Sequence, residues 1–181
     1  DRGAKADGRM AYTAMIYNPD SEHDERRRPP RQVRYLAGFY ALDELGLQLR
    51  HQAAQVGWDE AQQQIALSDG GSGMEEFLRM NFPLATCILD FYHAGGAALL
   101  ATWEQLDLTG RSAAVKEVYR QETQYIRNNV HRTNYPTYLA NGWQIGSGPV
   151  EAGCKTVVGQ RLKNSGMRWG NHCADNVCHL R

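Results

Sequence analysis

The sequence predicts an α/β fold, in which helices cover the faces of a parallel sheet. Short apolar runs of strand length alternate with segments that repeat apolar side chains every three or four residues. Turn-forming residues separate these segments, and 181 residues with 42% hydrophobic side chains can build a sizeable core. We therefore expect a single domain over residues 1–181, of the class in which ligand sites form at the carboxyl ends of strands.

The first half of the chain is predicted as strand, helix, strand and short helix. Residues 10–17 are apolar, β-branched or aromatic, and Asn18-Pro19 ends that strand. Apolar side chains at helical spacing predict a helix over 32–56. A strand over 64–68 and a short helix over 74–80 follow.

The second half begins with a near-continuous apolar run over 85–89, which is typical of a strand buried on both faces. Helical patterns then dominate, so we expect a mainly helical insertion over about 95–145. A last helix begins at Val150, behind Gly148-Pro149, because Pro is tolerated in a first helical turn. Strands joined through helices favour parallel pairing.

Composition limits the classes of protein. No apolar run reaches the roughly 18 residues of a membrane span, and the start carries no signal pattern. The scattered cysteines are expected to be reduced thiols of a cytoplasmic protein. Because the chain starts without Met and stops within a helical pattern, we expect it to be a fragment of a longer protein.

The charge balance does not favour general nucleic-acid binding, since 20 basic residues face 20 acidic ones. Residues 151–181 are an exception, with five basic and two acidic side chains. Candidate DNA contacts in that segment are Lys155, Arg161, Lys163, Arg168 and Trp169. The alternative is an ordinary exposed helix, with Trp169 in the core. The arginines over 26–34 indicate a solvated loop.

Two carboxylates are candidate ligands of Mg²⁺ or Mn²⁺. Asp69 follows a predicted strand and precedes two glycines, which let a ligand approach the backbone. Glu151 opens a helix behind a glycine-containing turn. Each also has an ordinary explanation, since Asp-Gly is a common turn and an acid suits the first turn of a helix.

Asp90 and His93 form an Asp-x-x-His pair at the end of the buried strand. The ordinary explanation is a partly buried Asp bonded to a His. The functional one is a His that contacts phosphate, transfers a proton or orients the site. Zinc is disfavoured, because the spacing of His172, Cys173 and the Cys178-His179 pair is not that of a zinc finger.

In combination, several segments resemble the ISKra group of bacterial insertion-sequence transposases, which is similar to the Mutator-like transposases. They are Leu67-Ser68-Asp69-Gly70-Gly71, Asp90-Phe91-Tyr92-His93, Gly146-Ser147-Gly148-Pro149-Val150-Glu151, and residues 160–169. The resemblance implies an RNase H-like core, which is a central mixed sheet flanked by helices. It also implies an Asp-Asp-Glu triad, in which Asp69 matches the second acid and Glu151 the third. Asp90 and His93 match the Asp-x-x-His signature and take a supporting role. The first acid is expected upstream of residue 1, with Asp1 and Asp7 as weak candidates.

The expected activity is therefore transposition, by cleavage and transfer of DNA strands with two Mg²⁺ or Mn²⁺ ions. Expected partners are the element ends and target DNA, bound by a homo-oligomer at the bacterial nucleoid. Two alternatives stay open: an inactive DNA-binding remnant of a decayed element, and a host nuclease with the same core.

Overall fold

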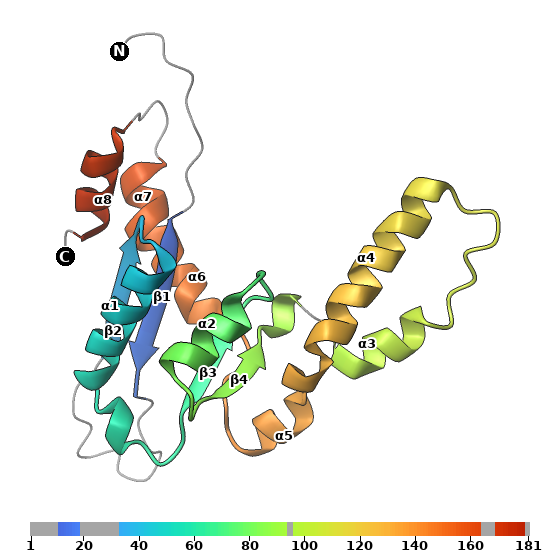
Figure 1. Ribbon diagram of the computed structural model, residues 1–181, viewed down its shortest axis with the longest axis horizontal. Coiled ribbons are helices and arrows are strands. Elements are labelled where there is room, and N and C mark those ends of the chain that lie inside the picture. Colours follow the sequence, from blue (N-terminus) through green and yellow to red (C-terminus); the bar gives the residue numbers. More distant parts are fainter. Residues whose placement is uncertain (1–10, 19–32, 94–95, 164–168, 180–181) are drawn as a thin grey trace. The chain divides into compact units, whose positions relative to one another are not determined.

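The computed structural model describes residues 11–18, 33–93, 96–163 and 169–179, with the main chain alone at 93, 96–98, 171 and 179. It has the predicted mixed α/β character (Figure 1). The chain divides into two compact units, one of residues 1–62 with 148–181 and the other of residues 63–147. The described strands form two separate two-stranded sheets, one in each unit, where a single central sheet was expected.

The first unit is built on an antiparallel pair, β1 (Tyr12–Tyr17) and β2 (Val33–Gly38), in the register Tyr12↔Gly38. Its N-terminal helices are α1 (Leu42–Ala54) and the short η1 (Trp58–Glu60). Its C-terminal part contains α6 (Gly148–Gly153), the π-helical turn η4 (Cys154–Gly159), α7 (Gln160–Leu162) and α8 (Asn171–His179).

The helix expected over 32–56 is wrong in its first part, since β2 occupies Val33–Gly38 and α1 begins only at Leu42. Tyr35, Leu36 and Phe39 have helical spacing, but β1 offers this segment a full ladder of backbone hydrogen bonds. Tertiary pairing of this kind overrides a local pattern, particularly in an aromatic and β-branched segment.

The second unit contains the parallel pair β3 (Ile65–Ser68) and β4 (Thr86–Leu89), joined through α2 (Met74–Asn81). After the turn η2 (Phe91–His93) come α3 (Gly96–Trp103) and α4 (Ala113–Asn129), capped by Ser112, whose Oγ accepts from the N–H of Val115. The short η3 (Val130–Arg132) and α5 (Tyr135–Ala140) complete it. The stretch expected to be mainly helical, about 95–145, contains these last four elements.

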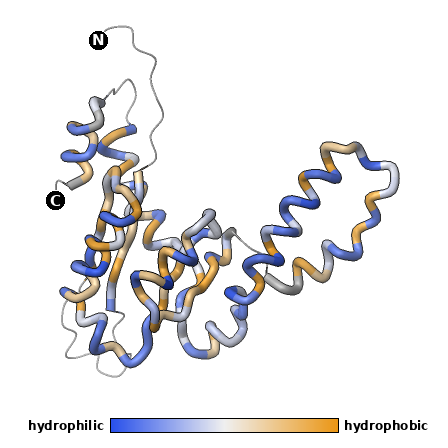
Figure 2. Tube along the Cα trace, in the orientation of Figure 1, coloured by the Kyte–Doolittle hydropathy of each residue, from blue (hydrophilic) through white to orange (hydrophobic). Residues whose placement is uncertain are grey.

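The core of the second unit lies where α5 and the following turn cover the parallel strands. Buried Ile88, Tyr135 and Tyr138 form its centre, and partly buried apolar side chains pack around them. The rings of Tyr138 and Trp143 stack with centroids 5.8 Å apart. By contrast, α4 is largely hydrophilic (Figure 2) and mostly exposed. Among the described residues, no helix has the length and apolar character needed to cross a membrane.

Candidate functional site

The carboxyl ends of β3 and β4 lie side by side, as expected for parallel strands. Ser68 pairs with Leu89, and the N–H of Asp90 donates to the carbonyl oxygen of Ser68 at 2.9 Å. Asp69 and Asp90 therefore leave the sheet at the same edge. The Asp69 side chain is exposed, and its Oδ1 accepts a hydrogen bond from the N–H of Gly71 at 3.2 Å. This leaves its other oxygen at the protein surface. Hard cations such as Mg²⁺ prefer carboxylate oxygens as ligands, so this oxygen could bind one.

Asp90 differs from Asp69 in being buried, with 1% of its surface exposed. Its Oδ1 accepts a hydrogen bond from the N–H of Tyr92 at 3.1 Å, which fixes the turn that contains η2. The next segment of the resemblance lies against this turn, since a Cβ on Gly146 would stand 3.1 Å from the Tyr92 ring. Asp90 therefore supports the chain at this edge and does not face solvent. The side chain of His93 lies outside the described residues.

A buried arginine, which the sequence does not single out, stabilises the Asp69 turn. Arg132 in η3 is 2% exposed, and its Nη2 donates to Ser68 Oγ at 2.7 Å. The Ser68 hydroxyl donates in turn to the carbonyl oxygen of Asp69 at 2.9 Å. Arg132 also donates to Ile88 O at 3.4 Å and to Asn129 Oδ1 at 3.3 Å. One guanidinium thus ties the ends of both strands to the end of α4.

The charge of Arg132 is offset by Glu75 in the first turn of α2, at 4.0 Å. Glu75 also accepts from His131 Nε2 at 2.8 Å and from Arg79 Nη2 at 2.7 Å. Burial raises the pKa of Glu75, but the hydrogen bond from His131 and the surrounding cations outweigh it, so the pKa lies below its ordinary value. Glu75 therefore stays ionised beside the arginine, as a buried cation requires.

Two tyrosines close the same edge. The Tyr125 side chain covers Gly70 so tightly that a Cβ there would overlap its ring and hydroxyl. Burial, and then the negative charge of Asp69, raise the pKa of Tyr125. Tyr135 donates its hydroxyl to Leu89 O at 3.1 Å, and burial raises its pKa to about 12. Both hydroxyls therefore stay protonated at neutral pH, and Gly70 is required by close packing.

Glu151 lies in the other unit, in the first turn of α6, and its side chain is exposed. Behind it, buried Gly153 packs against the ring of Tyr35, with an added Cβ only 2.8 Å from the ring. That contact fixes the helix against β2 within this unit. Asp69 and Glu151 thus belong to different units of the chain.

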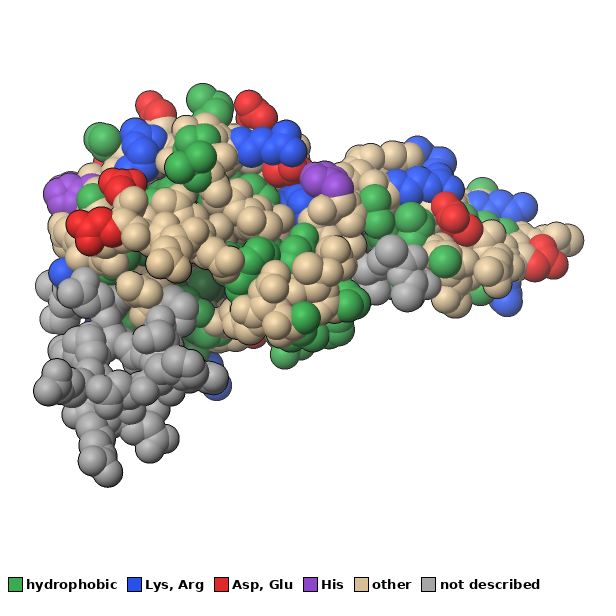
Figure 3. Space-filling view, turned by 90° about the horizontal axis from the view of Figure 1, so that it is seen from below, with side chains coloured by type: hydrophobic (Ala, Val, Ile, Leu, Met, Phe, Trp, Pro, Cys, Tyr) green, Lys and Arg blue, Asp and Glu red, His purple; other side chains and the backbone are tan. Residues whose placement is uncertain are grey.

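The candidate DNA contacts beyond Glu151 are only partly exposed. Lys155 and Lys163 are exposed, whereas Arg161 is half-buried and donates to Val177 O at 3.4 Å. Trp169 is 41% exposed and donates its Nε1–H to Leu162 O at 3.2 Å. Arg168 lies outside the described residues. On the face drawn in Figure 3, basic and acidic side chains are interspersed.

Within the described parts of the chain, no group of three or more His, Cys, Asp and Glu side chains could hold a metal ion. Comparison with protein-family models, curated proteins and solved structures finds no match to this chain. The proposals below therefore rest on the residues and their geometry, together with the resemblance of the motifs.

Proposed function

We propose that this chain is the catalytic domain of a DDE-type DNA transposase of the ISKra group, with an RNase H-like core. The observation that carries the proposal is Asp69, an exposed carboxylate at the carboxyl end of a parallel strand, on a turn anchored by a buried arginine. A carboxylate in that place serves phosphoryl transfer, which needs hard cations held in a fixed position. The antiparallel pair, the parallel pair and the crossover helix are compatible with this core.

In the proposed site, Asp69 and Glu151 are ligands of two Mg²⁺ or Mn²⁺ ions, together with an acid not located in the described residues. Bound there, the ions would supply Lewis-acid activation of water or a 3′-hydroxyl and stabilise the leaving oxygen. Asp90 holds its turn through the N–H of Tyr92. His93 is proposed to contact phosphate or transfer a proton.

DNA would be bound through the exposed Lys155 and Lys163, and Arg161, Arg168 and Trp169 are the other proposed contacts. Because the chain carries no net charge, affinity for phosphate has to come from such a local cluster. The element ends and target DNA are the proposed partners, acted on by a homo-oligomer in the bacterial cytoplasm.

The test is excision of the element by the full-length protein, with Asp69→Asn and Glu151→Gln assayed separately in Mg²⁺. Loss of a metal ligand removes several kcal/mol of transition-state stabilisation, so we expect each variant to lose about 100-fold or more. Glu117→Gln is the matched control, an exposed acid on α4, and should excise normally.

Normal excision by either variant refutes the metal assignment. If the unmodified full-length protein binds its element ends but does not cleave them, the decayed remnant is the better description. Cleavage of DNA without any dependence on element ends would instead favour a host nuclease.

A further inference from the structure

A groove runs along the free edge of β2, within the unit of residues 1–62 and 148–181. Among the described strands β2 pairs only with β1, on one side. A cavity of about 580 Å³ touches every residue of Val33–Ala37. Since successive side chains of a strand point to opposite faces, contact with all of them places the cavity at the strand's edge. Along that edge, alternate residues of β2 direct their N–H and C=O groups away from β1.

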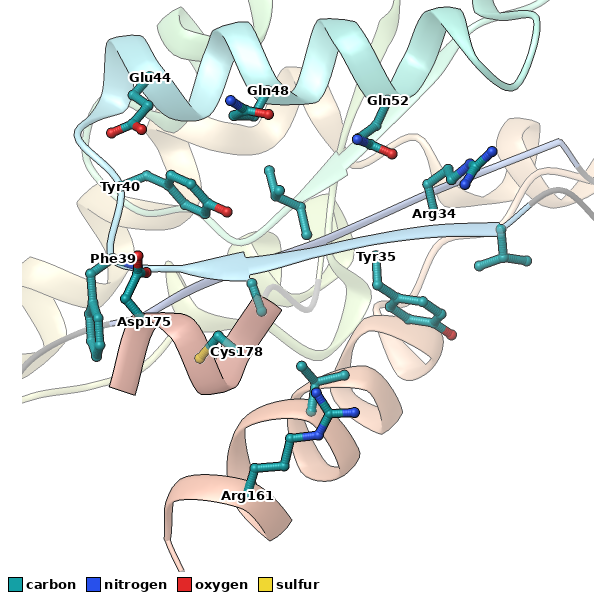
Figure 4. A pocket seen from close by; sticks show the side chains of 14 residues that line it. Arg34, Tyr35, Phe39, Tyr40, Glu44, Gln48, Gln52, Arg161, Asp175 and Cys178 are labelled. Carbon is teal, nitrogen blue, oxygen red and sulfur yellow. The ribbon is translucent and has the colours of Figure 1, made fainter. Parts of the chain in front are cut away.

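Helices form both walls of the groove (Figure 4). On one side α1 presents Glu44, Gln48 and Gln52, which recur every fourth residue and so share a helix face. On the other side lie Val157, the buried Cys178 and the half-buried Arg161, a wall that is apolar except for one guanidinium. The edge is thus recessed between two walls, which suits a single extended chain better than the edge of a second folded domain.

One wall carries a buried polar atom that lacks a hydrogen-bond partner within the described part of the chain. The Oε1 of Gln52 is buried and accepts no hydrogen bond from the described residues. A buried acceptor without a donor costs about 1–3 kcal/mol, and rotation of the Gln52 amide toward an N–H placed in the groove would remove that cost. An extended peptide supplies such N–H groups along its whole length.

Opposite charges gather at the two ends of the groove. Tyr40, Glu44 and Asp175 lie together near the end of β2, where Asp175 also accepts the N–H of Phe39 at 2.9 Å (Figure 4). Burial, followed by the negative charges of Asp175 and Glu44, raises the pKa of Tyr40. Arg34 lies toward the start of the strand. The acidic end favours a cationic side chain on the occupant.

We propose that this groove binds an extended peptide, which adds to β2 as a third strand and places a Lys or Arg side chain beside Glu44 and Asp175. Backbone hydrogen bonds to the edge provide affinity, and the charged end provides specificity, as in other cases of strand addition. This proposal uses neither Asp69 nor Glu151, so the excision test and the peptide test can fail separately, although Arg161 both lines the groove and is a proposed DNA contact.

The probes are fluorescein-labelled hexapeptides of alternating Val and Thr, with one Lys at either the first or the last position. We expect one of the two to bind the full chain in fluorescence anisotropy with a Kd below about 1 mM. N-methylation of the three alternate amides that face β2 should abolish binding, whereas methylation of the other three should leave it intact. A peptide with Glu in place of Lys should bind more weakly.

Glu44→Lys should weaken binding of the Lys peptide at least fivefold, on the order of 1 kcal/mol, and strengthen binding of the Glu peptide. Glu117→Lys, an exposed acid on α4 in the other unit, is the matched control and should change neither. The proposal is overturned if neither Lys peptide saturates at about 1 mM, or if both methylated series bind alike. A concentration-dependent dimer that excludes the peptide would assign the groove to a second copy and overturn it as well.

Discussion

Replacing Arg132 with Ala should loosen the carboxyl ends of β3 and β4 more than any exposed arginine of the same unit. The change removes one short charged hydrogen bond, at 2.7 Å, and two long ones, at 3.3 and 3.4 Å. The short bond is worth about 1.5–3 kcal/mol. The substitution also removes one of three cations beside Glu75, but the Glu75 side chain is 23% exposed and keeps Arg79 and His131, so this loss adds little.

Hydrogen exchange followed by mass spectrometry measures this effect locally, as the free energy of opening of the amides around Ser68 and Asp90. We expect Arg132→Ala to lower it by about 1.5–3 kcal/mol, the contribution of the short charged hydrogen bond. Arg132→Lys, which keeps the charge but not the planar fork, should lower it by less. Arg120→Ala is the control, because its side chain is 68% exposed and pairs with Glu117 at 2.8 Å on the surface of α4, so its loss should leave the opening of these amides unchanged.

A loss below about 1 kcal/mol for Arg132→Ala would refute the reasoning, since the guanidinium would then be no more important than a surface cation. If Arg132→Ala does not fold, Arg132→Lys decides the question. Unchanged protection in that variant would show that the hydrogen-bonding fork does not stabilise the turn.

Two further predictions concern the same edge. Because the folded pKa of Glu75 is depressed, its contribution to the free energy of unfolding is present above its unfolded pKa of about 4.3 and is lost as pH falls through the folded value. Glu75→Gln should therefore reduce the loss of unfolding free energy at acid pH, measured by urea denaturation at several pH values. The same dependence on pH in the variant and the unmodified protein would contradict the His131 pairing. Gly70→Ala should cost about 1–3 kcal/mol by overpacking against Tyr125, measured by urea denaturation. Tyr125→Ala in the same chain should reduce that penalty, and an equal penalty in both backgrounds would show that the overlap is not its cause.

Local sequence patterns predict much of the second unit, since β3, α2, β4 and α4 each carry a clear period or a turn signal. They also place Asp69 at the end of a strand. The same reasoning fails at β2, where Leu36 and Phe39 imitate a helical stripe and only pairing with β1 decides the structure. Periodicity reports on one element at a time and contains no information about the partner of a strand.

Arg132 could not be predicted for a related reason. It stands in a polar segment, His131-Arg132-Thr133, that suggests an exposed turn. Its burial depends on Ser68, 64 residues earlier, and on Ile88, 44 residues earlier. Only the folding of η3 against the strand ends brings these groups together. The division into two units is equally hard to foresee, because no linker-like composition marks the boundary near 62, and the single Gly146-Ser147-Gly148-Pro149 turn at the other boundary is also what the start of a helix requires.

The contacts that Arg132 makes limit where this protein can gain or lose residues. The tip of the helical region α3–α5 is the loop between α3 and α4, around Gly110. This loop is exposed, and Gly110 has a positive φ of 75°, so residues there can be added or removed at little cost. The base of the region is different, because Tyr125, Arg132 and Tyr135 all reach back to the strand ends. Natural or engineered forms with a shorter helical region should therefore lack residues at its tip and retain the residues at its base.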